Sequence, residues 1–128
     1  MIFEILDPGG CGVARLGMTQ QELRHHLGAF REFRRTTKSP SSDQFIDAGV
    51  MATYDGDGRV SILEFASPGD PRLLGLSVLG LAVAELLIHL ERVMGLVVVR
   101  ENDVVAVPAW EMSFYVPDDE VEGMLLGE

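Results

Sequence analysis

The chain carries one short sequence pattern twice. Residues 16–27 read LGMTQQELRHHL, and residues 79–90, which follow 63 positions later, read LGLAVAELLIHL, so that six of the twelve positions are identical. Repetition at a fixed spacing is typical of a supersecondary unit that occurs twice in one fold. A chain of 128 residues has the usual length of one domain. We therefore expect a single domain over residues 1–128, built of two similar units at about 1–66 and 73–128.

The first copy of the pattern contains the signals of a short helix. Thr19 and Glu22 have the spacing of a capping box, in which each side chain accepts a hydrogen bond from the backbone of the other residue. Apolar residues recur at helical spacing over 20–27, and Gly28 follows as a stop signal. The pattern predicts a helix over residues 20–27.

The second copy predicts a longer and more apolar helix over about 82–94, which ends before Gly95. Ala82 occupies the place of Thr19, so this helix lacks a side-chain cap at its start. Its polar residues form a narrow stripe, made of Glu85, His89 and Arg92. A helix with such a wide apolar surface is covered on most sides, by a sheet or by another subunit.

Runs that are typical of strands follow each predicted helix. They lie at 49–54, 59–65, 96–100, 104–107, 112–116 and 121–126. Residues 3–6 indicate an edge strand, 30–37 fit a strand or a loop, and 36–43 indicate an exposed loop. Residues 55–58, DGDG, predict a hairpin turn, and 66–71 predict a linker between the units. This order predicts an α+β fold: a tandem repeat of a short helix followed by antiparallel strands, with the helices packed on one face of an antiparallel sheet.

The net charge of −10 narrows the class of partner. Residues 1–42 have six basic and four acidic side chains, whereas residues 43–128 have four basic and sixteen acidic ones. Such an acidic surface argues against nucleic acid as a ligand. Polar residues and glycines interrupt the apolar stretch 73–90, so we expect no membrane span. Cys11 is the single cysteine, and the first residues lack the pattern of a signal peptide, which together favour the cytoplasm.

The start of the first predicted helix resembles a known signature. Leu16-Gly17-Met18-Thr19, Glu22-Leu23 and Gly28 are similar to the helix start of the β-lactamase-inhibitor-protein-like fold, which small outer-membrane assembly lipoproteins also carry. That resemblance implies a tandem helix-plus-sheet plan. The chain also resembles short uncharacterised bacterial proteins of actinobacterial type, which implies no particular activity. The second resemblance is carried by Phe3-Glu4-Ile5, Pro8-Gly9, Leu16-Gly17-Met18, Gly49-Val50, Tyr54-Asp55, Asp57-Gly58-x-Val60 and Ile62-Leu63-Glu64.

Each predicted helix carries a glutamate and a histidine four residues apart. The pairs are Glu22 with His26 and Glu85 with His89. A carboxylate can orient an imidazole as a general base or as a metal ligand, but helix capping and surface pairing explain the same spacing. Cys11 has no activating base at a defined spacing. We therefore expect no catalytic residue, no metal site and no cofactor.

The candidate binding residues are aromatic and basic. Tyr54 and Tyr115 hold equivalent places in the two predicted hairpins, 61 positions apart. A tyrosine on an open sheet face is a good anchor for a partner protein. Trp110 is a third aromatic candidate. Arg34 and Arg35 belong to a basic cluster that would meet an acidic partner or the acidic half of the protein itself.

These features predict a protein that acts by binding another protein, as an inhibitor, an immunity protein or an adaptor. The alternative is a small-ligand carrier or an enzyme, with a pocket between helix and sheet that Glu85 and His89 line. A homodimer joined through the apolar second helix is a third alternative.

Overall fold

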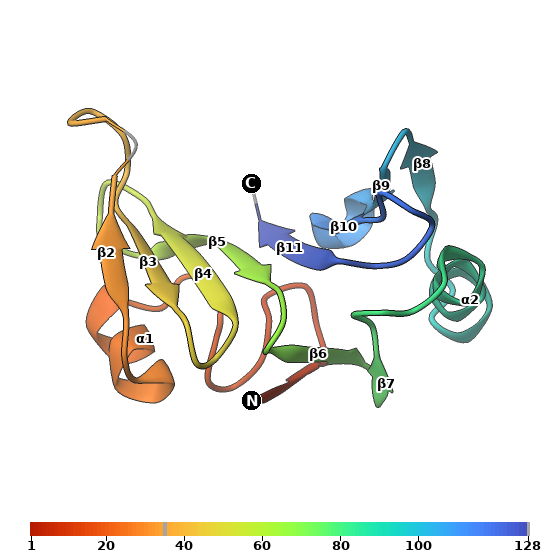
Figure 1. Cartoon of the computed structure of the whole chain (residues 1–128), viewed down its shortest axis with the longest axis horizontal. Helices are drawn as coiled ribbons and strands as arrows, with labels where there is room; N and C mark the ends of the chain where they lie inside the picture. The colour runs from red at the N-terminus through yellow and green to blue at the C-terminus, as the bar shows by residue number, and fades with distance from the viewer. Residues whose placement is uncertain (35, 128) are drawn as a thin grey trace.

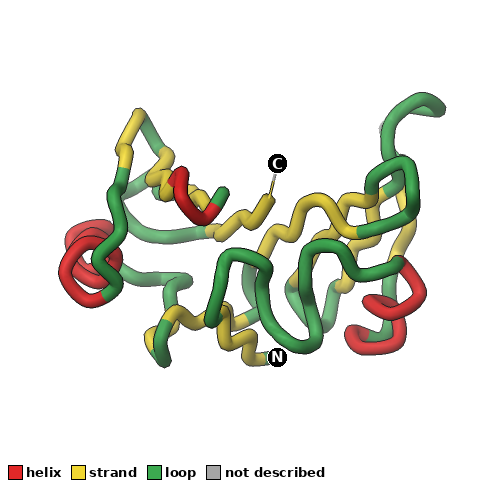
Figure 2. The backbone as a smooth tube through the Cα atoms, turned by 180° about the vertical axis from the view of Figure 1, so that it is seen from behind, coloured by secondary structure: helices red, strands yellow, loops and turns green. Residues whose placement is uncertain are grey.

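The computed structural model describes residues 1–34 and 36–127. The fold is mixed α+β, as the sequence predicts, with two short helices and two sheets (Figures 1 and 2). The larger sheet has the strand order β2-β3-β4-β5-β11-β10-β9-β8, and every neighbouring pair in it is antiparallel. Its strands are β2 (Arg31–Phe33), β3 (Ser42–Phe45), β4 (Val50–Tyr54), β5 (Val60–Phe65), β8 (Val99–Glu101), β9 (Val104–Val107), β10 (Met112–Tyr115) and β11 (Gly123–Gly127).

Each half of the large sheet comes from one continuous segment of the chain. The first segment consists of α1 (Gln20–Leu27) followed by β2 to β5, and the second of α2 (Val83–Ile88) followed by β8 to β11. A π-helical turn, η1 (His89–Val93), extends α2, and a 3-10 turn, η2 (Pro108–Trp110), separates β9 from β10. The two segments meet where β5 pairs with β11, with Glu64 opposite Leu125.

Matching backbone hydrogen bonds tie both helix starts to the last hairpin of their own segment. In the first segment, the N–H of Gly17 donates to the carbonyl of Val60 at 2.8 Å, and the N–H of Val60 donates to the carbonyl of Met18 at 2.8 Å. The second segment has the corresponding bonds, Gly80 to Val121 at 2.8 Å and Val121 to Leu81 at 2.9 Å. Each helix therefore begins at a fixed place beside its own hairpin, β4–β5 or β10–β11.

The smaller sheet belongs to neither of these two helix-plus-strand segments. It consists of β1 (Ile2–Ile5), β6 (Asp70–Leu73) and β7 (Leu76–Ser77), and β1 runs parallel to β6. The segment expected as a linker, 66–71, therefore contains the start of a strand. Phe3 of β1 contacts Phe65 of the large sheet, with ring centroids 5.1 Å apart, so the small sheet covers part of the large one.

α1 begins and ends as the sequence predicts. The Oγ1 atom of Thr19 accepts from the N–H of Glu22, and the N–H of Thr19 donates to the Glu22 carboxylate, both at 3.2 Å. Gly28 follows with φ +80°, a conformation that favours glycine. The hydrogen bonds from Thr19 lower the pKa of Glu22. The box is therefore fully formed at neutral pH, and its contribution to stability is lost as the pH falls through that lowered pKa.

The second helix starts without a side-chain cap, again as the sequence predicts. Ala82 has extended N-cap geometry, with φ −64° and ψ 141°, but its side chain accepts no hydrogen bond. The π-helical turn that follows is closed by a hydrogen bond from the N–H of Met94 to the carbonyl of His89 at 3.0 Å. The two helices therefore begin at equivalent sequence positions with different capping chemistry.

This difference gives a paired prediction on stability. Thr19→Ala removes the acceptor of a capping box and is expected to cost about 1 kcal/mol of unfolding free energy. Ala82→Thr places a threonine three residues before Glu85, in N-cap geometry and at an exposed position, and is expected to add about 0.5–1 kcal/mol. Urea denaturation followed by circular dichroism measures both values. Equal and negligible effects at the two positions would contradict the capping argument.

Alternation along the strands gives the large sheet two distinct faces. The inner face is buried against α1, the small sheet and α2 in one apolar core. Its residues include Phe45, Val50, Ala52, Tyr54, Leu63, Phe65, Val105, Val107, Met112, Phe114, Met124 and Leu126. We call the opposite side the outer face. Within the described residues, no helix has the length and apolar character needed to cross a membrane.

Candidate functional site

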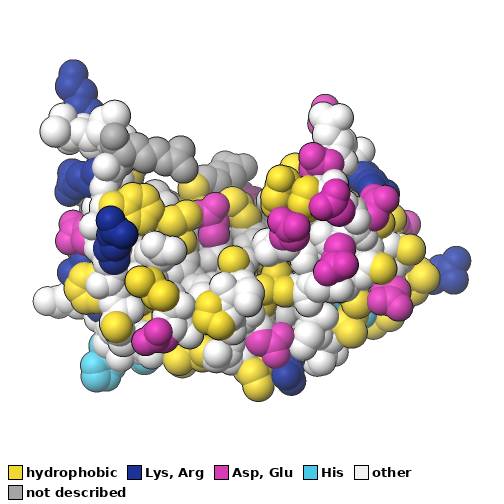
Figure 3. All heavy atoms as spheres, viewed as in Figure 1, with side chains coloured by type: hydrophobic (Ala, Val, Ile, Leu, Met, Phe, Trp, Pro, Cys, Tyr) yellow, Lys and Arg dark blue, Asp and Glu magenta, His cyan; other side chains and the backbone are white. Residues whose placement is uncertain are grey.

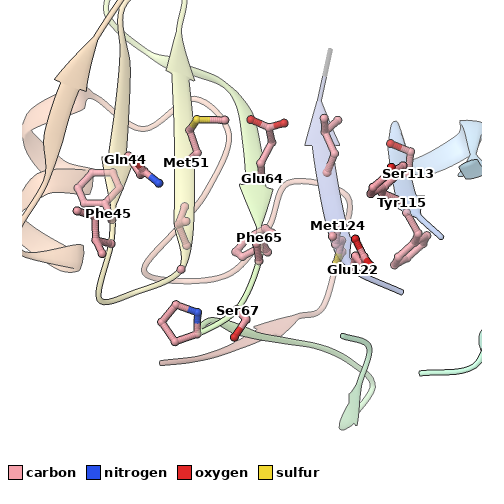
Figure 4. A pocket seen from close by; sticks show the side chains of 18 of the residues that line it. Gln44, Phe45, Met51, Glu64, Phe65, Ser67, Ser113, Tyr115, Glu122 and Met124 are labelled. Carbon is pink, nitrogen blue, oxygen red and sulfur yellow. The ribbon is translucent and has the colours of Figure 1, made fainter. Parts of the chain in front are cut away.

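The outer face forms a continuous row of side chains across all eight strands. Successive strand pairs place the following residues opposite one another: Arg31, Gln44, Met51, Glu64, Leu125, Ser113, Ala106 and Val99. Met51 and Glu64 project side by side from β4 and β5 (Figure 4). The row is partly apolar and half-buried at its centre.

This face is hollowed into a groove. Its larger part has a volume of about 650 Å³ and lies at the end of the sheet where β4 begins and β5 ends. A smaller part of about 360 Å³ lies toward the β2–β3 hairpin. Met51, Glu64 and Leu125 line both parts, so the two parts lie next to each other. Figure 3 shows the depression between two raised ends of the molecule.

Tyr115 lies in this groove as an exposed aromatic side chain. It is 51% exposed and pairs across the sheet with Val104 and Gly123. Val104 is also exposed, so the groove has an apolar wall on the side of β9 and β10. The prediction of Tyr115 as a side chain on an open sheet face is confirmed in its geometry.

The same prediction is wrong for Tyr54. Its side chain is 1% exposed and lies on the inner face, where its hydroxyl donates to Asp43 at 2.7 Å. The cause is alternation along β4, which places Tyr54 on the same face as the buried Val50 and Ala52, whereas Met51 and Thr53 face outward. The residue of β4 that faces outward like Tyr115 is therefore Thr53, and the two tyrosines are not equivalent.

The remaining candidate residues do not gather in the groove. Trp110 lies in η2, where it is half-buried against the core. Arg34 is exposed just after β2, at the end of the sheet opposite to β8. Arg35 lies outside the described residues. The structure therefore brings Tyr115, but neither Trp110 nor Arg34, into the lining of the main groove.

The two ends of the groove differ in charge. Basic residues lie along β2 and the β2–β3 hairpin, namely Arg31, Arg34 and Lys38. Acidic residues surround the turns at the other end, namely Glu101, Asp103, Asp118, Asp119, Glu120 and Glu122. Figure 3 shows Lys and Arg gathered mainly at one raised end and Asp and Glu at the other. A partner that covers the whole groove would meet both signs of charge.

A buried ion pair that no local sequence pattern predicts holds α1 on the inner face. Asp43 of β3 is fully buried and accepts from the Nε and Nη2 atoms of Arg24 at 2.8 and 2.9 Å. Arg24 also bonds Glu32 at 3.1 Å, and its guanidinium lies 3.9 Å from the centre of the Phe30 ring. The hydrogen bonds that Arg24 donates to Asp43 raise the pKa of Arg24. Burial, together with the bond to Asp43, raises the pKa of Tyr54.

This cluster has the character of a structural element. In the described part of the chain, every buried side-chain nitrogen and oxygen has a hydrogen-bond partner. Asp43 is saturated by an ion pair and by the Tyr54 hydroxyl, and it has no contact with solvent. A carboxylate in that position fixes the helix to the sheet and is closed to a ligand.

The two glutamate–histidine pairs do not form. Glu22 is engaged in the capping box, and His26 is exposed. Glu85 is exposed, whereas His89 is buried with its Nε2 atom 2.7 Å from the carbonyl oxygen of Leu73. Neither histidine lines either part of the groove. Among the described residues, no group of His, Cys, Asp and Glu side chains has the geometry to hold a metal ion.

No protein-family model matches this chain, and no curated protein or solved structure matches it either. The function is therefore inferred from the geometry of the groove and from the residues that line it.

Proposed function

We propose that the protein acts by binding another protein through the outer face of the large sheet, as an inhibitor, an immunity protein or an adaptor. The observation that carries this proposal is the groove on the outer face, which has two adjoining parts and an exposed tyrosine in the lining of the larger one. Protein interfaces favour a central apolar region with aromatic anchors and a polar rim. The groove supplies Met51, Leu125 and Tyr115 as apolar side chains near the central Glu64, between rims of opposite charge.

We further propose that the two segments are copies of one ancestral unit. The repeated pattern at 16–27 and 79–90 supports this, and so do the matching hydrogen bonds at the two helix starts. The unit would be a helix followed by a four-stranded meander, joined to its copy through β5 and β11. This plan is the one implied by the resemblance to the β-lactamase-inhibitor-protein-like fold. The cytoplasmic location suggested by the single cysteine belongs to the same proposal.

The test is partner capture with matched surface variants. The wild-type chain, carried on a bead, is used to retain a stoichiometric partner from an extract of its source cells, and the affinity of the purified pair is then measured. Tyr115→Arg and Met51→Arg each place a charge in the groove. Each is expected to lower the affinity for the partner at least tenfold, because it disrupts a desolvated interface centre.

The matched control is Ile88→Arg on α2. Ile88 is 52% exposed, almost the same as Tyr115, but it lies outside the groove. Its substitution is expected to leave the affinity unchanged. A partner that tolerates both groove variants and is lost with Ile88→Arg would overturn the proposal and favour a contact through the apolar second helix.

A small apolar ligand in the same groove is the second candidate, because about 650 Å³ lies within the usual range of small-molecule sites. The ligand would then lie in the groove, whose lining does not include Glu85 or His89, the residues expected from the sequence to line the pocket. Nile red, a neutral apolar dye, serves as the probe. Saturable fluorescence enhancement that Met51→Arg abolishes and Ile88→Arg preserves would support a ligand site, whereas absence of enhancement would exclude it for compounds of that class.

A further inference from the structure

Among the described residues, the two outermost strands of the large sheet have no strand partner on one side. β2 and β8 are the outermost strands of the order β2-β3-β4-β5-β11-β10-β9-β8. The residues of β8 are all exposed, and those of β2 are exposed or half-buried. An open edge presents unpaired N–H and C=O groups that can pair with another chain.

The side chains of both edges have defined directions. In β2, Arg31 and Phe33 point to the outer face, because they lie opposite Gln44 and Ser42, and Glu32 points to the inner face beside Asp43. In β8, the outward residues are Val99 and Glu101, which lie opposite Ala106 and Val104, and Arg100 points inward beside the buried Val105. Each edge thus has two outward residues and one inward residue.

The backbone groups that face the open edges are also defined. The N–H of Tyr54 donates to Ser41 at 3.1 Å, and the N–H of Val116 donates to Asp103 at 2.7 Å. Backbone groups alternate in direction along a strand, so these two bonds fix which residues of each strand face which neighbour. When this alternation is followed from strand to strand, the N–H and C=O groups of Glu32 and Arg100 face the open edges of the sheet.

We propose that β2 of one copy of this chain pairs with β8 of a second copy. In the antiparallel register that joins Glu32 to Arg100, Arg31 lies opposite Glu101 and Phe33 lies opposite Val99. This register satisfies three independent conditions. Outward residues meet outward residues, the backbone groups at the two edges face each other, and both charged pairs have opposite signs.

Pairing of like edges meets the charge condition less well. Two β2 strands in full overlap place Glu32 opposite Glu32, and two β8 strands place Arg100 opposite Arg100. Like charges directly opposite one another destabilise a strand pair, whereas opposite charges and apolar pairs stabilise it. The edges are therefore complementary to each other and mismatched to themselves.

The contact is heterologous, since it uses a different edge on each copy. A pair of copies still has one free β2 and one free β8, so the assembly grows until it closes into a ring or continues as a filament. Outer faces meet outer faces in this register, so the grooves of successive copies lie on one continuous side. With three residues on each strand, the association is expected to be weak and dependent on concentration and salt.

Sedimentation velocity over a concentration series tests the proposal with single charge reversals. Arg31→Glu and Glu101→Arg each convert the outward charged pair into a like pair, and each is expected to weaken association roughly tenfold. The chain that carries both reversals restores an opposite pair and is expected to associate like the wild type. In the described chain neither residue forms an ion pair, so both variants leave the fold intact.

Charge reversals at positions away from the edge strands control for the change in net charge. Lys38→Glu changes the charge by the same amount as Arg31→Glu, and Asp57→Arg by the same amount as Glu101→Arg; both positions are exposed. These controls are expected to associate like the wild type. A wild-type chain that stays monomeric at all concentrations, or a double variant that associates no better than the single ones, would overturn the proposal.

Discussion

Replacement of Asp43 by alanine is expected to lower the free energy of unfolding by about 3 kcal/mol, which corresponds to a fall in the melting temperature of roughly 10 °C. The carboxylate is fully buried, and its removal leaves the guanidinium of Arg24 and the hydroxyl of Tyr54 without their acceptor. Loss of one partner from a buried pair costs more than the pair itself contributes, because the remaining charge stays desolvated. The side chain of Arg24 is 26% exposed, which places the estimate at the lower end of the usual range.

The matched control uses the second carboxylate of the same arginine. Glu32→Ala removes an ion pair of 3.1 Å whose carboxylate is about half exposed, and it is expected to cost less than about 1 kcal/mol. Tyr54→Phe removes one hydrogen bond to Asp43 and is expected to cost about 1 kcal/mol. Urea denaturation of the three variants gives the comparison. Equal costs for Asp43→Ala and Glu32→Ala would contradict the assignment of Asp43 as the buried anchor of α1.

The parts of the fold that sequence reasoning predicts well are those that local chemistry determines. α1 spans the predicted residues 20–27, because the capping box and Gly28 lie within one short segment. The runs at 49–54 and 59–65 contain β4 and β5, because the DGDG turn between them is a strong local signal. Partners four residues or fewer apart can be recognised in a single sequence.

The parts that it misses depend on contacts between distant residues. The Ser, Thr and Pro residues of 36–43 predict an exposed loop, but β3 begins at Ser42, and Asp43 is buried through its bonds to Arg24 and Tyr54. The parallel pairing of β1 with β6 joins residues nearly 70 positions apart. No local pattern predicts either contact, because the partners lie far apart in the sequence.

The candidate site shows the same division. Alternation along β10 predicts correctly that Tyr115 faces away from the core. The inference from repeat equivalence fails for Tyr54, because alternation along β4 places it on the inner face with Val50 and Ala52. The groove itself could not be predicted, because its lining comes from β3, β4, β5, β9, β10 and β11. The neighbouring positions of β5 and β11 are known only from the strand order.

Gly49→Ala is expected to have an effect at least as large as Asp43→Ala, about 3–4 kcal/mol of unfolding free energy. Gly49 precedes β4 with φ +73°, and a Cβ atom there would overlap the backbone nitrogen of Gly69 and the carbonyl oxygen of Ala66. The overlapped nitrogen and oxygen are hydrogen-bonded to each other, with the N–H of Gly69 donating to the carbonyl of Ala66 at 2.8 Å. The N–H of Ala66 in turn donates to the carbonyl of Gly49 at 2.9 Å. The substitution therefore adds left-handed strain to an overlap that no side chain can relieve.

Two glycines of the β4–β5 turn separate the contribution of left-handed backbone strain from that of steric overlap. Gly58 has the same φ of +73° but no atom within 4 Å of an added Cβ, so Gly58→Ala is expected to cost about 1–2 kcal/mol from backbone strain alone. Gly56 has neither a positive φ nor a neighbour within 4 Å, so Gly56→Ala is expected to change stability by less than about 0.5 kcal/mol. Thermal and urea unfolding of the series measures all three costs. If Gly49→Ala cost no more than Gly58→Ala, the close approach of the segment 66–69 to the start of β4 would be wrong, and with it the wall that this segment gives to the groove.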